Sequence, residues 1–515
     1  MNKLDVLFVN PGNAGAIYQG LAADYSSVET PTWSLLLAQS CRSVGFSVGI
    51  LDALAENLSD EDVAKKVQKL DPRLICFVVY GQNPNSGTVN MSGTIKIAQQ
   101  IKKLGIETLV SLVGSHVQAL PHKTLLDESE NIDFIFTNEA VYALRNVLAL
   151  QTIDKQSLKS VKGIGFIENS KPYLTPPERI VPQERMDADL PGYAWDLLPY
   201  KEKSLDLYRA HFWHAEYKHE NRTPFAAIYT SLGCQFKCSF CMINVINRND
   251  NEEIGVASNY SGMRFWSPEF IIKEFDKLVE MGVRTLRISD EMFLLNRKFY
   301  VPLCNLLIER GYGEILNMWA YSRVDTIKNP ENIKLIRKAG IKWLCLGIES
   351  ADKNVRLEVT KGSFEDVDIT KVVQIVHDHD IEIIANYLVG LPGDNHETMQ
   401  ATLDLGLQLN TMAWNMYAAM ALPGSQLFRD ALKNGIPLPK DYSGFSFHSY
   451  DTLPLPTEKL SAAEILKFRD AAFEIYHTNP KFLEKIESKF GAIARNNIEK
   501  MTKIKLRRKI IEEQA

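Results

Sequence analysis

Three cysteines lie within eight residues of one another, at Cys234, Cys238 and Cys241, with the spacing C-x3-C-x2-C. Three thiolates this close can hold three irons of a [4Fe-4S] cube and leave the fourth iron without a protein ligand. A small molecule can chelate such an open iron. A structural zinc site needs four ligands, but the nearest further cysteine is Cys304, and His219 stands at no zinc-finger spacing. A disulfide is disfavoured in a tight cluster of odd number, so the loop is predicted to hold an iron–sulfur cluster.

The same spacing resembles that of the radical S-adenosylmethionine (SAM) superfamily. The resemblance implies that the open iron holds SAM by its amino and carboxylate groups. A low-potential electron then cleaves a carbon–sulfur bond and leaves a 5′-deoxyadenosyl radical, which takes hydrogen from an unactivated C–H bond. It also implies two kinds of partner: a small-molecule substrate, and an external low-potential electron donor of the flavodoxin or ferredoxin type.

The composition is that of an ordinary globular enzyme. The chain has 515 residues, of which 45% are hydrophobic and 23% are charged, and its net charge is −5. The length predicts two or three domains. The charge provides no basic excess that would bind nucleic acid. No run of about 18 apolar residues predicts a membrane span, and the first residues predict a strand in place of a signal peptide. Seven cysteines, an odd number, indicate a reducing compartment, and the cytoplasm is the expected location.

The first third of the chain alternates apolar runs with amphipathic helices, for example at 32–44 and 88–104. This alternation predicts a doubly wound, Rossmann-like parallel sheet, with strands at 5–9, 47–51, 74–79, 108–113 and 133–137. Such sheets bind ligands at the carboxyl ends of their strands.

Placed directly before the cysteine loop, this domain resembles the cobalamin-binding domain of the cobalamin-dependent branch of radical SAM enzymes. The resemblance implies cobalamin as a third cofactor, contacted by Asn10, Tyr80, Gly114, His116 and Glu139. Three departures stand out: Val113 occupies the place of a frequent glycine, the turn at 137–140 lacks the glycine common there, and no Asp-x-His-x-x-Gly motif is present, because Asp52 is followed by Ala53 and Leu54. Two alternatives therefore remain open: a degenerate domain that only covers the site, and a structural role for His116.

From residue 223 the strand–helix pattern begins again. Six strands are predicted, at 226–231, 285–288, 318–322, 343–347, 383–389 and 415–419. Together with the resemblance they imply a partial (β/α)6 barrel of the TIM type, in which chemistry takes place at the carboxyl ends of the strands. The predicted division of the chain is a cobalamin-binding domain at 1–145, a linker with a hairpin at 146–222, a radical SAM barrel at 223–425 and a mostly helical C-terminal region at 426–515.

Polar residues follow several of the predicted barrel strands. Asp290 and Glu291 could accept a hydrogen bond from the ammonium of SAM, while the fork of Arg323, beside Ser322, suits its carboxylate. The resemblance further implies SAM contacts from Glu349, in a Gly-Ile-Glu-Ser motif. For each carboxylate, a salt-bridged group at the rim is the alternative.

The fifth predicted barrel strand ends in a glycine turn. The resemblance implies that Gly390 and Gly393 cradle the adenine of SAM. Cys41, Cys76, Cys304 and Cys345 stand in apolar contexts that predict buried small side chains. Five further residues are candidates for the substrate pocket by location alone: His396, Trp414, Tyr417, His448 and Tyr450.

The leading hypothesis is cobalamin-dependent C-methylation of an unactivated carbon in a biosynthetic small molecule. Radical oxidation or cyclisation without methyl transfer, as in the anaerobic magnesium-porphyrin cyclase group, is the alternative. Methylthiolation of tRNA is disfavoured because the N-terminal domain has only Cys41 and Cys76, too few for a second cluster. A non-catalytic iron–sulfur or cobalamin sensor is disfavoured by the complete set of predicted SAM contacts.

Overall fold

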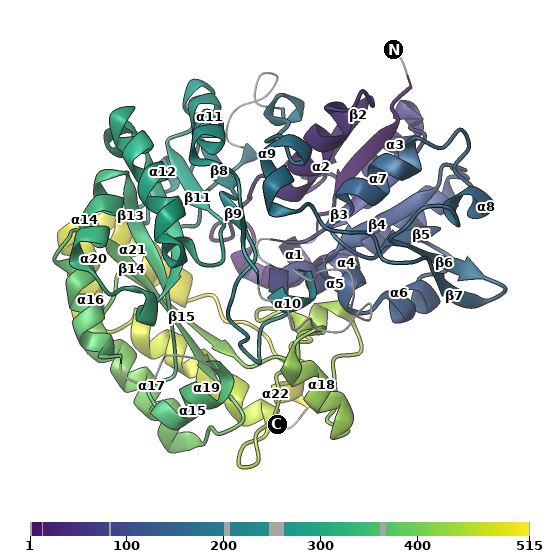
Figure 1. The fold of residues 1–515 in the computed structure, drawn as a ribbon. Helices are drawn as coiled ribbons and strands as arrows, with labels where there is room; N and C mark the ends of the chain where they lie inside the picture. The colour runs from purple at the N-terminus through teal and green to yellow at the C-terminus, as the bar shows by residue number, and fades with distance from the viewer. Residues whose placement is uncertain are drawn as a thin grey trace.

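A computed structural model describes residues 3–12, 14–81, 84–199, 207–246, 262–360 and 367–513. Its first sheet has seven strands in the order β2-β1-β3-β4-β5-β6-β7 (Figure 1). The parallel strands are β1 (Val6–Asn10), β2 (Val48–Asp52), β3 (Ile75–Val79), β4 (Val110–Gly114) and β5 (Phe134–Phe136). The predicted hairpin forms as β6 (Ile164–Glu168) and β7 (Lys171–Leu174), and β6 pairs antiparallel with β5, so the hairpin extends this sheet.

Helices cover both faces of the first sheet, which confirms the doubly wound prediction. Phe8 and Cys76 pack on the side of α2 (Thr32–Arg42) and α7 (Val141–Leu148). The alternate residues Leu7 and Phe77 pack on the side of α3 (Asp60–Leu70) and α4 (Gly87–Lys103). Two short helices, α5 (Ser115–Ala119) and α6 (Pro121–Asp127), follow β4.

The strand order of this sheet reverses between β1 and β3. The chain leaves β1 toward β2 on one side and continues from β3 toward β4 on the other. Doubly wound sheets bind ligands at the carboxyl ends of the strands at such a switch point. Here those ends carry Asn10 and Tyr80.

The second sheet is an open half-barrel of six parallel strands in the order β15-β14-β13-β12-β11-β8. Its strands are β8 (Phe225–Ile228), β11 (Thr285–Ile288), β12 (Asn317–Arg323), β13 (Ile341–Glu349), β14 (Glu382–Val389) and β15 (Ala413–Ala418). All six predicted strands form, and their ends differ from the prediction by at most three residues. The partial barrel is therefore confirmed.

Helices follow the strands around the outside of this half-barrel (Figure 1). They are α11 (Pro268–Glu280), α12 (Arg297–Glu309), α14 (Pro330–Lys338), α16 (Ile369–His377) and α17 (His396–Leu409). The hydroxyl of Ser267 accepts a hydrogen bond from the N–H of Phe270 at the start of α11, and Pro268 occupies the first turn, as the sequence predicted.

The C-terminal region is helical and packs on the barrel edge. It contains α18 (Gln426–Lys433), α19 (Ala462–His477), α20 (Pro480–Phe490), α21 (Ala492–Thr502) and α22 (Lys509–Glu512). Trp414 of β15 stacks on Tyr476 of α19, with ring centroids 4.8 Å apart. None of the described helices is long and apolar enough to cross a membrane.

Three buried histidines are expected to make the stability of the fold depend on pH. Burial lowers the pKa of His116 and His477 to about 4 and that of His214 to about 3. In the unfolded chain a histidine titrates near pH 6.5, so between pH 6.5 and about 4 the unfolded state binds more protons. Stability therefore falls as the pH falls through this window, by about 2 kcal/mol per histidine between pH 6.5 and 5.

The contribution of His116 is isolated by comparing how far the urea midpoint changes between pH 7 and pH 5 in a variant and in the wild type. In His116→Gln the midpoint at pH 5 should be higher relative to that at pH 7 than it is in the wild type, whereas His122→Gln, on the exposed side of α6, should behave as the wild type. The same change of midpoint in His116→Gln and in the wild type would contradict the prediction.

Candidate functional site

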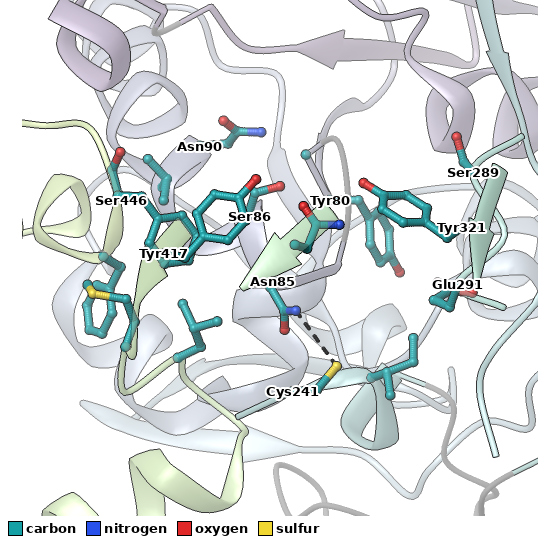
Figure 2. Close-up of a pocket in the computed structure, with 18 of the residues that line it drawn as sticks. Tyr80, Asn85, Ser86, Asn90, Cys241, Ser289, Glu291, Tyr321, Tyr417 and Ser446 are labelled. Carbon is teal, nitrogen blue, oxygen red and sulfur yellow. Dashed lines mark hydrogen bonds between the residues drawn. The ribbon is translucent and has the colours of Figure 1, made fainter. Parts of the chain in front are cut away.

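A cavity of about 470 Å³ lies where the carboxyl-terminal edges of the two sheets face each other. Figure 2 shows side chains from both domains pointing into it, among them Tyr80 and Asn90 of the first domain and Glu291, Tyr321 and Tyr417 of the half-barrel. The cysteine loop and residues 445–448 complete its wall.

All three cysteines of the loop line this cavity, and none of them forms a disulfide with another described residue. Burial raises the pKa of Cys234 to about 12 and that of Cys238 further, while the nearby Arg323 guanidinium acts in the opposite direction. In the part of the chain that the structure describes, no three His, Cys, Asp or Glu side chains are close enough to share one metal ion. The three cysteine sulfurs that hold a [4Fe-4S] cube lie farther apart than three ligands of one metal ion do, since each cysteine binds its own iron. The donor chemistry thus fits an iron–sulfur cluster.

The two adjacent carboxylates after β11 have different surroundings. Asp290 is fully buried and accepts three hydrogen bonds of 2.6 Å, from the N–H and hydroxyl of Thr230 and from the hydroxyl of Ser231. It does not line the cavity. These bonds hold the chain after β8, where the predicted first strand ends early and β9 (Ser231–Leu232) instead pairs with β10 (Arg264–Phe265).

Glu291 faces the cavity. Its Oε2 atom is buried and has no hydrogen-bond partner among the described residues, and burial raises the pKa of this carboxyl to about 8. A buried acceptor without a donor is costly, and a cationic ligand group would satisfy it. Of the two carboxylates, only Glu291 is therefore placed to bind a ligand in this cavity.

Ser322 and Arg323 line the cavity at the end of β12. The Arg323 fork donates to both carboxylate oxygens of Asp325, at 2.6 and 2.5 Å, and its Nη1 lies 3.9 Å from the sulfur of Cys238. The guanidinium also stacks over the ring of Phe236 at 3.5 Å. Its positive charge therefore stands beside the cysteine loop, with two of its nitrogens engaged by Asp325.

Glu349 ends β13 with a left-handed backbone, φ 65°, where the pairing with β14 shifts register. A Cβ on Gly347 would come within 2.6 Å of Glu349 Oε1, so the glycine makes room for the carboxylate. Both residues line the cavity. Burial raises the pKa of Glu349 to about 7, partly offset by Arg323. A second partly desolvated carboxylate thus faces the same space.

The predicted glycine turn after β14 lies elsewhere. Neither Gly390 nor Gly393 lines the cavity, and a Cβ on Gly390 would meet Ile465 of α19 at 2.7 Å. The side chain of Asp394 holds the turn by accepting from the N–H of Leu391. The turn packs against the C-terminal helices, and its contact with adenine stays a prediction.

Two of the five predicted cobalamin contacts line the cavity. The amide of Asn10 donates to Asp52 at 2.8 Å, and Tyr80 stacks on Trp33, with ring centroids 4.6 Å apart. Gly114 lies against the backbone of Val79 outside the cavity.

The other two predicted contacts are engaged in the protein. His116 is buried, its Nδ1 is 3.0 Å from the hydroxyl of Thr88, and Tyr442 covers it edge-on. Glu139 is buried in a two-pronged pair with Arg264, whose Nη2 lies 2.7 Å from its Oε2. Neither residue lines the cavity.

Part of the cavity wall is aromatic. Tyr321 and Tyr417 project from β12 and β15, Tyr18 ends α1 (Ala14–Tyr18), and Phe447 and His448 come from a loop. Of the pocket candidates chosen by location, Tyr417 and His448 line the cavity; Trp414 is buried behind it, and His396, with its side chain 68% exposed, lies outside. Tyr450 does not line it.

Tyr321 was not among the residues that the sequence predicted for the pocket. Period-two alternation was the available signal, since Tyr321 and Arg323 are alternate residues of β12 and therefore share a face.

Residues from both ends of the chain hold the wall segment 446–448. Gln19 donates to the carbonyl of His448 at 2.7 Å. Arg508 is buried and donates to the carbonyls of Phe447 and Ser449 at 3.0 and 3.1 Å, and it pairs with Asp470 at 2.9 Å.

A buried ion pair joins the two domains beneath the cavity. Arg287 of β11 and Glu29, which lines the cavity, approach to 2.5 Å, and His211 lies 3.2 Å from the same carboxylate. The guanidinium also lies over the rings of Trp319 and Tyr321, at 4.8 and 5.3 Å.

Comparisons with known proteins match both halves of the chain. Residues 228–406 match the family model of the radical SAM superfamily, and residues 18–148 match that of the B12 binding domain. An uncharacterised methyltransferase of Pyrococcus horikoshii is 25% identical over 94% of this chain and 95% of its own. The anaerobic magnesium-protoporphyrin IX monomethyl ester cyclase of Cereibacter sphaeroides is 24% identical over 86% of this chain and 66% of its own.

A solved structure has the same fold. The radical SAM methyltransferase TsrM from Kitasatospora setae, determined with cobalamin and a [4Fe-4S] cluster bound, superposes with a TM-score of 0.62. The match covers 97% of this chain and all of that one, at 16% identity.

Proposed function

This chain combines a radical SAM domain with a B12-binding domain, and we propose that it methylates an unactivated carbon of a small molecule. The two domains imply a [4Fe-4S] cluster, SAM and cobalamin as cofactors. One observation carries the proposal: a single cavity is bounded by the ligand-binding edge of the B12-binding sheet and by the cysteine loop. When bound, the cluster with SAM supplies a radical that removes hydrogen from carbon, and cobalamin supplies a methyl group.

In this proposal the cysteine loop holds the cluster. Cys234, Cys238 and Cys241 supply three thiolates, and the Arg323 cation, 3.9 Å from the Cys238 sulfur, offsets part of their negative charge. Reduction through an external low-potential donor belongs to the proposal.

SAM lies in this proposal beside the two desolvated carboxylates. Glu291, with its unpartnered Oε2, accepts from the ammonium group, and Glu349 binds at the ribose or amino end. Asp290 does not contact SAM in this proposal and acts indirectly. Its three hydrogen bonds fix the chain at the end of the strand that precedes the cysteines.

On the B12-binding side, Asn10 and Tyr80 form the edge that faces the half-barrel. Cobalamin bound there adjoins the same space as SAM. No histidine of this domain is among the described residues of the cavity wall, so none of them is placed there to bind the cobalt from below.

The aromatic part of the cavity wall accepts the substrate in this proposal. Tyr18, Tyr321, Tyr417 and Phe447 offer ring faces and hydroxyls, and Arg287 and His211 already compensate the carboxylate of Glu29. These walls suit an uncharged organic molecule held by stacking and hydrogen bonds.

Product analysis with methyl-labelled SAM tests the function. We expect the anaerobically reconstituted enzyme with cobalamin and reductant to form 5′-deoxyadenosine and S-adenosylhomocysteine together, and a product heavier by one labelled CH2. The likeness to the cyclase favours a second candidate, radical cyclisation or oxidation. In that case 5′-deoxyadenosine forms without S-adenosylhomocysteine, and methyl transfer is disproved.

Glu291→Gln is expected to weaken SAM binding about ten- to hundredfold, because a charge-assisted hydrogen bond to the ammonium is replaced by a neutral one. Equilibrium binding of SAM to the reconstituted protein measures the effect. The exposed Glu280→Gln at the end of α11 is the matched control and should bind as the wild type. Unchanged affinity in Glu291→Gln would remove this residue from the SAM site.

A further inference from the structure

Each cysteine sulfur of the loop has a nitrogen donor within 4 Å. Besides the backbone N–H of Ile243, which also donates to Cys241, three donors come from different parts of the molecule. They are the N–H of Phe236 to Cys234 at 3.4 Å, Nη1 of Arg323 to Cys238 at 3.9 Å, and Nδ2 of Asn85 to Cys241 at 3.7 Å. Of these three donors only Asn85 belongs to the B12-binding domain. Figure 2 shows its side chain reaching Cys241.

The Asn85 side chain makes a second bond to the same loop. Its Oδ1 accepts from the N–H of Met242 at 3.1 Å. An N–H can donate only to the oxygen of the amide, so this bond fixes the orientation of the side chain and directs the NH2 group to the sulfur. The two bonds together clamp the third cysteine and the residue after it.

Packing holds the clamp in place. Asn85 lies in a single turn, η2 (Pro84–Ser86), directly before α4. Met242 and Val245, which follow the third cysteine, pack against Ala119 of α5 in the same domain. The last part of the cysteine loop thus packs against the B12-binding domain, while its first part continues from the half-barrel.

We propose that Asn85 is a positioning residue that holds Cys241 and sets the reduction potential of the cluster from the B12-binding domain. The proposal rests on the proposed cluster site. Hydrogen bonds to the sulfurs are among the factors that set the potential of an iron–sulfur cluster. A donated N–H stabilises the reduced, more negative cluster, so its loss lowers the potential. In this proposal the B12-binding domain thereby tunes the reduction potential of the iron–sulfur cluster.

Two substitutions separate the two bonds. Asn85→Leu removes both. Asn85→Asp keeps an oxygen for Met242 but has no hydrogen to donate to Cys241. Asn90→Leu, one turn into α4 on the same wall, is the matched control for a change in cavity shape.

The readouts are iron content and the midpoint potential from an EPR-monitored titration of the reconstituted full chain without substrate. We expect Asn85→Leu to lose iron, and both Asn85 variants to have about tenfold less reduced cluster at a fixed solution potential. For one electron that is a shift of about 59 mV to more negative values. Asn85→Asp should keep its iron, and Asn90→Leu should match the wild type.

The outcomes separate this proposal from the proposed function. If the wild type holds no cluster, both fail. If the wild type holds one and Asn85→Asp titrates at the wild-type potential, only the role of Asn85 as donor is overturned. A control variant shifted as far as the Asn85 variants would also overturn it.

Discussion

Cys238→Ala is expected to lose its iron–sulfur cluster and with it all detectable cleavage of SAM. The remaining thiols, Cys234 and Cys241, would leave two irons of the cube without protein ligands. Since the radical chemistry belongs to the cofactors, no other side chain of the cavity can replace it. Arg323 would also lose the Cys238 sulfur that lies 3.9 Å from its Nη1, while it would keep its pair with Asp325. Iron and sulfide content, the EPR signal of the reduced protein and 5′-deoxyadenosine formation measure the effect.

The matched control is Cys304→Ala. Cys304 is a fully buried thiol of α12 that lies outside the cavity. This variant should keep its iron and its turnover and lose only stability, by about 1 kcal/mol for the small cavity that it leaves. Wild-type iron content in Cys238→Ala, or lost iron in Cys304→Ala, would contradict the assignment of the cysteines.

Arg287→Met is expected to destabilise the protein by about 3–5 kcal/mol, because it leaves the buried carboxylate of Glu29 without its main partner. The side chains of Arg287 and Glu29 are only 1% and 7% exposed, so solvent compensates the orphaned charge poorly. Protonation of His211, 3.2 Å from the same carboxylate, would recover part of the loss. Urea unfolding at neutral pH measures the effect.

A second substitution tests the reason for that loss. The double variant Glu29→Gln with Arg287→Met removes the orphaned charge and should recover much of the stability. Arg284→Met serves as control, because the Arg284 side chain is exposed and donates to the backbone carbonyls of Val279 and Val283. If the double variant is no more stable than Arg287→Met, the cost does not come from the unpaired carboxylate.

The regular elements could be predicted because burial imposes their periodicity. The strands of both sheets are short apolar runs between helices, and turns at their ends leave little freedom in placing them. Prediction failed where the role of a side chain depends on which of two neighbouring positions faces the cavity. Asp290 and Glu291 are adjacent carboxylates of the same type, yet only one faces the cavity, and the sequence offers no signal for which.

Other site features depend on contacts between residues far apart in the chain. His116 was placed at a strand end correctly, but Tyr442, from the C-terminal region, covers it. Asn85 contacts a cysteine 156 positions away. An asparagine in a loop carries no mark of such a partner, because the pairing is set by how the two domains dock.

The wall at residues 446–448 has a consequence for how the enzyme is made. Gln19 and Arg508 secure that wall from opposite ends of the chain. Both bonds from Arg508 to this wall come from a residue that follows the half-barrel in the chain by about ninety positions. A half-barrel that has folded before Arg508 docks therefore still lacks part of what fixes one side of its cavity.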